Sequence, residues 1–83
     1  MNARHYIRAF IVDTFLVDDD FPDDVSLLRS GIIGPMGLAI LGAFLEETFR
    51  IRVGDDELVE SNLDSIERAA AFVERKNSRQ AVA

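Results

Sequence analysis

Most of the residues in this chain that could do chemistry are carboxylates. Asp18, Asp19 and Asp20 form a run that Asp23 and Asp24 follow closely. Clustered carboxylates bind hard cations such as calcium, but this run lacks the regular alternation and the distal glutamate of an EF-hand loop. We therefore expect a solvated loop here and no metal site.

A second acidic pair, Glu46 and Glu47, could supply a general acid and a general base if both side chains faced one substrate. Adjacent residues on a helix point about 100 degrees apart, so these two do not converge. His5 is the single histidine and there is no cysteine, so no clustered His or Cys site can form. With no nucleophile–base pair and no phosphate-binding loop, we expect that the protein is not an enzyme.

Composition limits the classes of partner. The chain has 83 residues, enough for one small domain, and its fifteen acidic and nine basic residues give a formal charge of −6. This charge argues against nucleic acid and anionic membrane surfaces and suits a protein partner with a basic surface. The uncharged run over residues 30–45 is shorter than the ~20 residues that a membrane span needs. The apolar stretch near the N-terminus is broken by Asp13 and lacks a signal-peptide cleavage site, so we expect a cytoplasmic protein.

The spacing of apolar residues predicts a first helix over residues 4–17, with Ile7, Ile11 and Phe15 on its inner face and Leu16 and Val17 widening that face. A long connection over residues 18–34 follows. It is too apolar for a free loop, and we expect it to be ordered, with its hydrophobic side chains tucked under the helices. These side chains are Leu27, Leu28, Ile32 and Ile33, and Gly31 is the residue expected to turn at positive φ.

A second helix is predicted from Gly34-Pro35 to Phe49. Proline suits the first position of a helix, where its missing N–H would have no partner, and glycine is an acceptable N-cap. The helix is apolar nearly all round until Glu46. Such a helix is either central to the domain or has a face that binds a partner.

The remaining chain predicts an extended link, a turn at Gly54, one or two helical turns within residues 55–61, and a last helix. Asp64 or Ser65 would cap this helix, and with Asp64 as the cap Glu67 would complete a capping box. We expect the helical domain to cover residues 1–76 and residues 77–83 to be a disordered tail. No strand pattern is present, so the fold class is all-α, with three main helices and a short one.

These segments, in this order, resemble an acyl carrier protein or the related peptidyl carrier domains. SLLRSGII at residues 26–33 resembles the loop before the family's modification site. MGLAILGAFLEETFRIRV at residues 36–53 resembles the second helix and the link after it, and DDELVESNLDSIERAAAFV at residues 55–73 resembles the third helix and the start of the fourth. The resemblance covers nearly the whole chain and implies a small four-helix bundle with a long first loop.

The resemblance breaks at the residues that carry the family's chemistry. In that family an Asp-Ser pair begins the second helix, and the serine hydroxyl carries a 4'-phosphopantetheine arm whose thiol holds acyl or aminoacyl groups. Gly34-Pro35 stands at that place here. Because proline has no hydroxyl, we predict no cofactor and treat Pro35 and Gly34 as a non-functional equivalent of the attachment site. Ser30 is an alternative hydroxyl, although a turn or capping role explains it more simply.

The resemblance also indicates where a partner would dock. Family partners meet the second helix through acidic residues and an apolar residue just after the serine, and Met36 occupies that apolar position. We expect partner contacts at Met36, Ile40, Ala43, Glu46 and Glu47, and the alternative for the three apolar residues is packing in the core.

Three functions stay open at this point. The first is a carrier-like domain that binds an acyl- or aminoacyl-processing enzyme or another carrier in fatty acid, polyketide or nonribosomal peptide biosynthesis. The second is a genuine carrier with an unusual attachment site, or a variant of a serine-containing parent. The third is a structural module that self-associates through the second helix.

Overall fold

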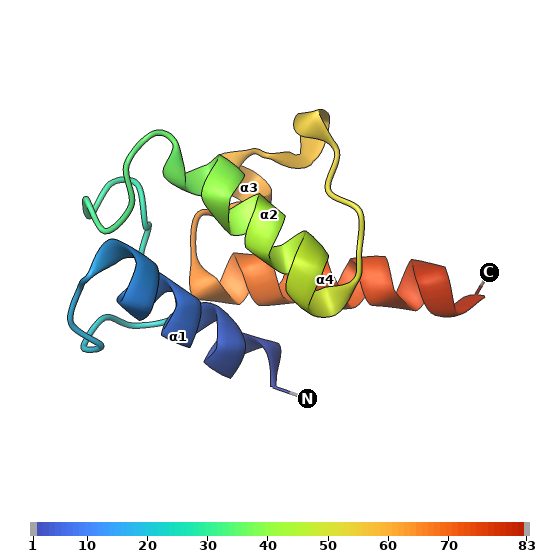
Figure 1. The fold of residues 1–83 in the computed structure, drawn as a ribbon, viewed down its shortest axis with the longest axis horizontal. Coiled ribbons are helices and arrows are strands. Elements are labelled where there is room, and N and C mark those ends of the chain that lie inside the picture. Colours follow the sequence, from blue (N-terminus) through green and yellow to red (C-terminus); the bar gives the residue numbers. More distant parts are fainter. Residues whose placement is uncertain (1, 83) are drawn as a thin grey trace.

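The computed structural model describes the backbone of residues 2–82 and the side chains of residues 2–78. Within this range the chain forms four α-helices and one 3-10 turn, and no strand. This confirms the all-α prediction. Figure 1 shows α1, α2 and α4 as the long elements, with the short α3 between α2 and α4 and a long connection between α1 and α2.

Helix α1 covers Ala3–Phe15. Asn2 caps its N-terminus by accepting a hydrogen bond from the backbone N–H of His5 at 3.4 Å. The helix ends earlier than the predicted residue 17, because Leu16 turns into the left-handed region at φ 55. The side chain of Leu16 is consequently 88% exposed, so the prediction that it widens the buried face is wrong.

The long connection is ordered, as predicted. Leu27 and Ile33 are buried, Leu28 and Ile32 pack against the core from partly buried positions, and Gly31 has φ +78. Backbone bonds tie the connection to the other end of the chain. Leu27 N–H donates to the carbonyl of Asp64 at 2.8 Å, so the connection is held against the segment that precedes α4.

Helix α2 covers Gly37–Phe49, two residues later than predicted, and Met36 is its N-cap. Gly34-Pro35 therefore lies in the turn before the helix, where Gly37 N–H donates to the carbonyl of Gly34 at 2.8 Å. This bond reaches back three residues, whereas a bond within an α-helix reaches back four. The regular helix therefore begins only after this turn. Pro35 is accordingly not the first helical residue.

After α2 the chain makes the 3-10 turn η1 (Asp55–Glu57) and the short helix α3 (Glu60–Leu63). Helix α4 then covers Ile66–Val82. Ser65 is its cap, since its Oγ accepts from Arg68 N–H at 3.0 Å. The prediction of a capping box between Asp64 and Glu67 is wrong, because Glu67 N–H donates instead to the carbonyl of Asp23.

Helix α4 continues past Lys76, where we expected the domain to end and a disordered tail to begin. Residues 77–82 contain no glycine or proline, so nothing in the local sequence stops the helix. The division into a domain and a tail stays a prediction, and Ala83 lies outside the described residues.

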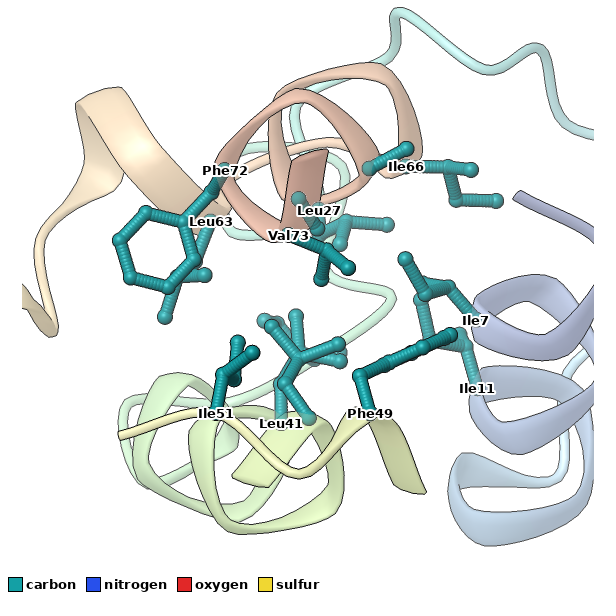
Figure 2. Packing of buried hydrophobic residues seen from close by; sticks show 14 residues of the cluster. Ile7, Ile11, Leu27, Leu41, Phe49, Ile51, Leu63, Ile66, Phe72 and Val73 are labelled. Atoms are coloured by element: carbon teal, nitrogen blue, oxygen red, sulfur yellow. The ribbon is translucent and has the colours of Figure 1, made fainter. Parts of the chain in front are cut away.

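One hydrophobic core joins all these elements. Figure 2 shows Ile7 and Ile11 of α1 and Leu41 and Phe49 of α2 pointing toward Val73 of α4. Aromatic rings extend the contact between α1 and α2, with Phe10 stacked on Phe44 at 4.0 Å between ring centroids. The buried core residues are Ile7, Ile11, Leu27, Ile33, Leu41, Leu45, Phe49, Ile51, Leu63, Ile66, Ala69, Ala70, Phe72 and Val73.

Candidate functional site

The turn before α2 is open to solvent. Gly34 and Pro35 are both exposed, and a Cβ added at Gly34 would meet no atom within 4 Å. The backbone there would therefore admit a larger residue without a clash. The pair offers neither a hydroxyl nor a carboxylate, so the residues present do not fit attachment of a phosphopantetheine arm.

The face of α2 that follows this turn is apolar and exposed. Met36 is 72% exposed and Ile40 41% exposed, and Ala43 lies one turn further along the same face. The opposite face holds the buried Leu41 and Leu45, which accounts for the orientation of the helix. The structure thus places the predicted partner-binding residues together on the surface, and packing of Met36, Ile40 and Ala43 in the core is excluded.

Two carboxylates stand at the C-terminal end of this face. Glu47 is exposed and makes no ion pair with any other described residue. Glu46 is also exposed, but its Oε2 accepts a hydrogen bond from Val53 N–H at 2.9 Å, which holds the link after α2. This second role was not visible in the sequence. We call the five residues Met36, Ile40, Ala43, Glu46 and Glu47 the α2 patch.

Three serine hydroxyls, those of Ser26, Ser30 and Ser65, each accept a hydrogen bond from a backbone amide two or three residues later. Ser30 Oγ donates to the carbonyl of Leu27 and accepts from Ile32 N–H, both at 3.4 Å, as a turn residue does. Ser26 and Ser65 make capping bonds to the amides three residues later, of Arg29 and Arg68. The bonds of Ser30 and Ser65 agree with the turn and cap roles predicted for these two residues.

The acidic run is only partly solvated, so the prediction of a simple solvated loop is corrected. Arg8 of α1 donates to Asp19 at 2.8 Å and to Asp23 at 2.6 Å, and Arg4 donates to Asp23 at 3.0 Å. The bonds from Arg8 and Arg4 hold the pKa of Asp23 below its ordinary value, and the bond to Asp23 raises the pKa of Arg8. Asp19 and Asp23 therefore pin the start of the connection to α1.

Sequence reasoning missed the role of Asp64, which was assigned only as a possible cap. Asp64 is only 5% exposed, and its carboxylate accepts hydrogen bonds from Leu28 N–H at 2.9 Å and from the Ser26 hydroxyl. We call this set of bonds the Asp64 clasp. A small polar cleft of about 130 Å³ lies beside it, and both carboxylates and arginines line the cleft, so no single charge of ligand is favoured. The lining residues are Asp24, Ser26, Arg29, Glu60, Asp64, Ser65 and Arg68.

The described part of the chain offers no grouping suited to metal binding: nowhere do three or more His, Cys, Asp or Glu side chains come together. His5 is exposed near the start of α1, on a different helix from the α2 patch. Within residues 2–82 no helix is long and apolar enough to span a bilayer. The candidate functional site is the α2 patch, an exposed apolar surface with two carboxylates at its C-terminal end.

A scan against models of known protein families gave no match, and a search among curated proteins gave none either.

Proposed function

We propose that this protein is an acyl-carrier-protein-like domain that acts by binding another protein of an acyl or aminoacyl biosynthetic pathway and carries no acyl group itself. The observation that carries this proposal is the exposure of Met36 and Ile40 directly after Pro35. The docking residues that the resemblance implies are present on the surface, while the hydroxyl that it implies is missing.

The arrangement of the helices supports this proposal. Three long helices, a short third one and a long, ordered first connection occur in the order expected for an acyl-carrier-protein-type bundle. The turn before α2 lies where the attachment residue of such a bundle would stand, in an exposed position.

The chemistry of the α2 patch suggests the kind of partner. Its apolar part would fill a hydrophobic depression, and Glu46 and Glu47 at its edge would meet basic side chains around that depression. A carrier-processing enzyme or another carrier-binding protein with a basic rim fits this description.

A binding measurement tests the proposal directly. Purified carrier-processing enzymes of the same organism would be titrated with the wild type and with Ile40→Asp, which places a charge in the apolar part of the α2 patch. We expect at least one enzyme to bind the wild type and to lose about tenfold or more in affinity with Ile40→Asp. Val59→Asp is the matched control, because Val59 is 40% exposed on a different element. Equal weakening by both variants, or no binding enzyme, would contradict the proposal.

Arm transfer separates this function from that of a genuine carrier. The wild type and Gly34→Asp/Pro35→Ser would be incubated with coenzyme A and a broad-specificity phosphopantetheinyl transferase and then weighed by mass spectrometry. We expect no mass gain for the wild type and a gain of one arm for the double variant, since both positions are exposed and a Cβ added at Gly34 would meet no atom within 4 Å. A mass gain in the wild type that disappears with Ser30→Ala would show that the protein is a carrier.

A further inference from the structure

The two glutamates of the α2 patch lie on different sides of the helix. Residues four apart on an α-helix are neighbours on the same side. Glu47 follows Ala43 by four residues, and Ala43 is exposed. Glu46 follows Gly42 by four residues, and Gly42 is buried, since a Cβ added there would lie 3.6 Å from Cγ1 of Val53. The two carboxylates therefore extend toward different surroundings, Glu47 toward solvent and Glu46 toward the link after α2.

Glu46 is bonded to this link. Its Oε2 accepts a hydrogen bond from Val53 N–H at 2.9 Å, and the side chain of Val53 is partly buried against the core. One oxygen of the Glu46 carboxylate is thus occupied by the backbone of the same chain. The bond holds the link beside the α2 patch, which is the role of a positioning residue.

Glu47 carries the charge that has no partner within the described chain. It is exposed and makes no ion pair with another described residue. With Met36, Ile40 and Ala43 it follows the spacing i, i+4, i+7 and i+11, which places the four residues in one stripe along the helix. A carboxylate at the end of an apolar stripe is complementary to a basic side chain beside an apolar depression.

We propose that Glu47 is the carboxylate through which the α2 patch contacts a basic side chain of its partner, whereas Glu46 acts within the chain by positioning the link through Val53. This inference rests on the function proposed above and narrows the partner. Seven residues separate Ile40 from Glu47, which corresponds to about 10 Å along a helix. The partner is therefore a protein whose apolar depression for Ile40 has a lysine or arginine about 10 Å away, in the direction of the C-terminal end of α2.

Two amide variants test this division of roles. The purified carrier-processing enzymes that test the proposed function would be titrated with Glu47→Gln and with Glu46→Gln, at low and at high salt. Both variants remove one negative charge, but the amide oxygen introduced by Glu46→Gln can still accept the Val53 N–H bond. We expect Glu47→Gln to weaken binding about fivefold and to reduce the loss of affinity with salt, and Glu46→Gln to change the affinity less than about twofold.

The outcomes separate this inference from the function on which it rests. If no enzyme binds the wild type, both are contradicted. If an enzyme binds and loses affinity with Ile40→Asp, the proposed function is supported. Weakening of that complex by Glu46→Gln as strong as by Glu47→Gln, or no effect of Glu47→Gln, would then overturn this inference alone.

The positioning role of Glu46 is tested on the protein by itself. Hydrogen exchange of the Val53 amide, followed by NMR, reports its hydrogen bond. We expect Glu46→Ala to accelerate this exchange about fivefold or more, because it removes the acceptor, and Glu46→Gln to retain most of the protection. Glu47→Ala is the matched control and should leave the Val53 amide unchanged. Equal exchange in the wild type and in Glu46→Ala would overturn the positioning role.

Discussion

At the scale of single residues, Asp23 shows how one side chain in an acidic run can become structural. Its carboxylate accepts hydrogen bonds from Arg8 and Arg4, and its carbonyl accepts one from Glu67 N–H of α4. The residue therefore contacts both the first and the last helix. Asp24, its neighbour in sequence, is exposed and makes no ion pair with another described residue.

Because Arg8 and Arg4 lower the pKa of Asp23, the ionised carboxylate stabilises the fold. This contribution is complete above the ordinary pKa of 3.8 and is lost as the pH falls below it, through the lowered pKa of the folded state. We expect Asp23→Asn to lower the free energy of unfolding by about 1 kcal/mol at neutral pH and by much less near pH 2. Urea unfolding at stepwise decreasing pH measures the difference, with Asp24→Asn as control. A pH-independent effect of Asp23→Asn would contradict this explanation.

At the scale of elements, the start of α2 depends on a glycine at the first helical position. A Cβ added at Gly37 would come within 2.6 Å of Cβ of Ile33, which is 2% exposed in the core. Since Ile33 Cβ is fixed by its backbone, it cannot move aside as the end of a flexible side chain can. The glycine thus allows the connection and α2 to pack closely.

We expect Gly37→Ala to destabilise the protein by about 1–3 kcal/mol, although alanine has the higher helix propensity, because the buried contact with Ile33 must open. Gly34→Ala is the matched control, since its added Cβ would meet nothing within 4 Å. Thermal and urea unfolding of both variants provide the measurement. Equal stability of the two would show that Ile33 can relax and that Gly37 is not required for packing.

At the scale of the whole molecule, the Asp64 clasp joins segments far apart in the sequence. The carboxylate of Asp64 accepts hydrogen bonds from the Ser26 hydroxyl and the Leu28 amide, and the backbone carbonyl of Asp64 accepts one from the Leu27 amide. The long first connection is thereby held against the start of α4, which also keeps Leu27 in the core.

We expect Asp64→Ala to lower the free energy of unfolding by about 2–3 kcal/mol, because it leaves the partly buried Leu28 amide and the Ser26 hydroxyl without their acceptor. Ser26→Ala removes one bond to the same carboxylate and should cost less. The two substitutions share a partner, so the double variant should be less destabilised than the sum of the single ones. Strict additivity in urea unfolding would mean that the Ser26–Asp64 bond contributes no coupling energy.

Local sequence patterns were enough to predict the helical class and the succession and approximate bounds of the long helices. They also predicted that the first connection is structured. Hydrophobic spacing is a local signal, and it located Ile7 and Ile11 of α1 correctly in the core. The loss of a hydroxyl at Pro35 is likewise readable from the residue alone. The function proposed from the resemblance stays a prediction that the binding and arm-transfer experiments test.

Tertiary contacts select the exposed face of α2 and the side chains of the acidic run that are paired. Helix α2 is apolar nearly all round, so periodicity cannot select its buried face, and packing against α1 and α4 does so. The residues that bond to the carboxylates of Asp23 and Asp64 lie 15 to 38 residues away, a separation at which sequence spacing carries no distance information. The exposure of Leu16 could not be predicted from the sequence for the same reason, because the direction of its side chain depends on where the chain leaves α1 to reach those partners.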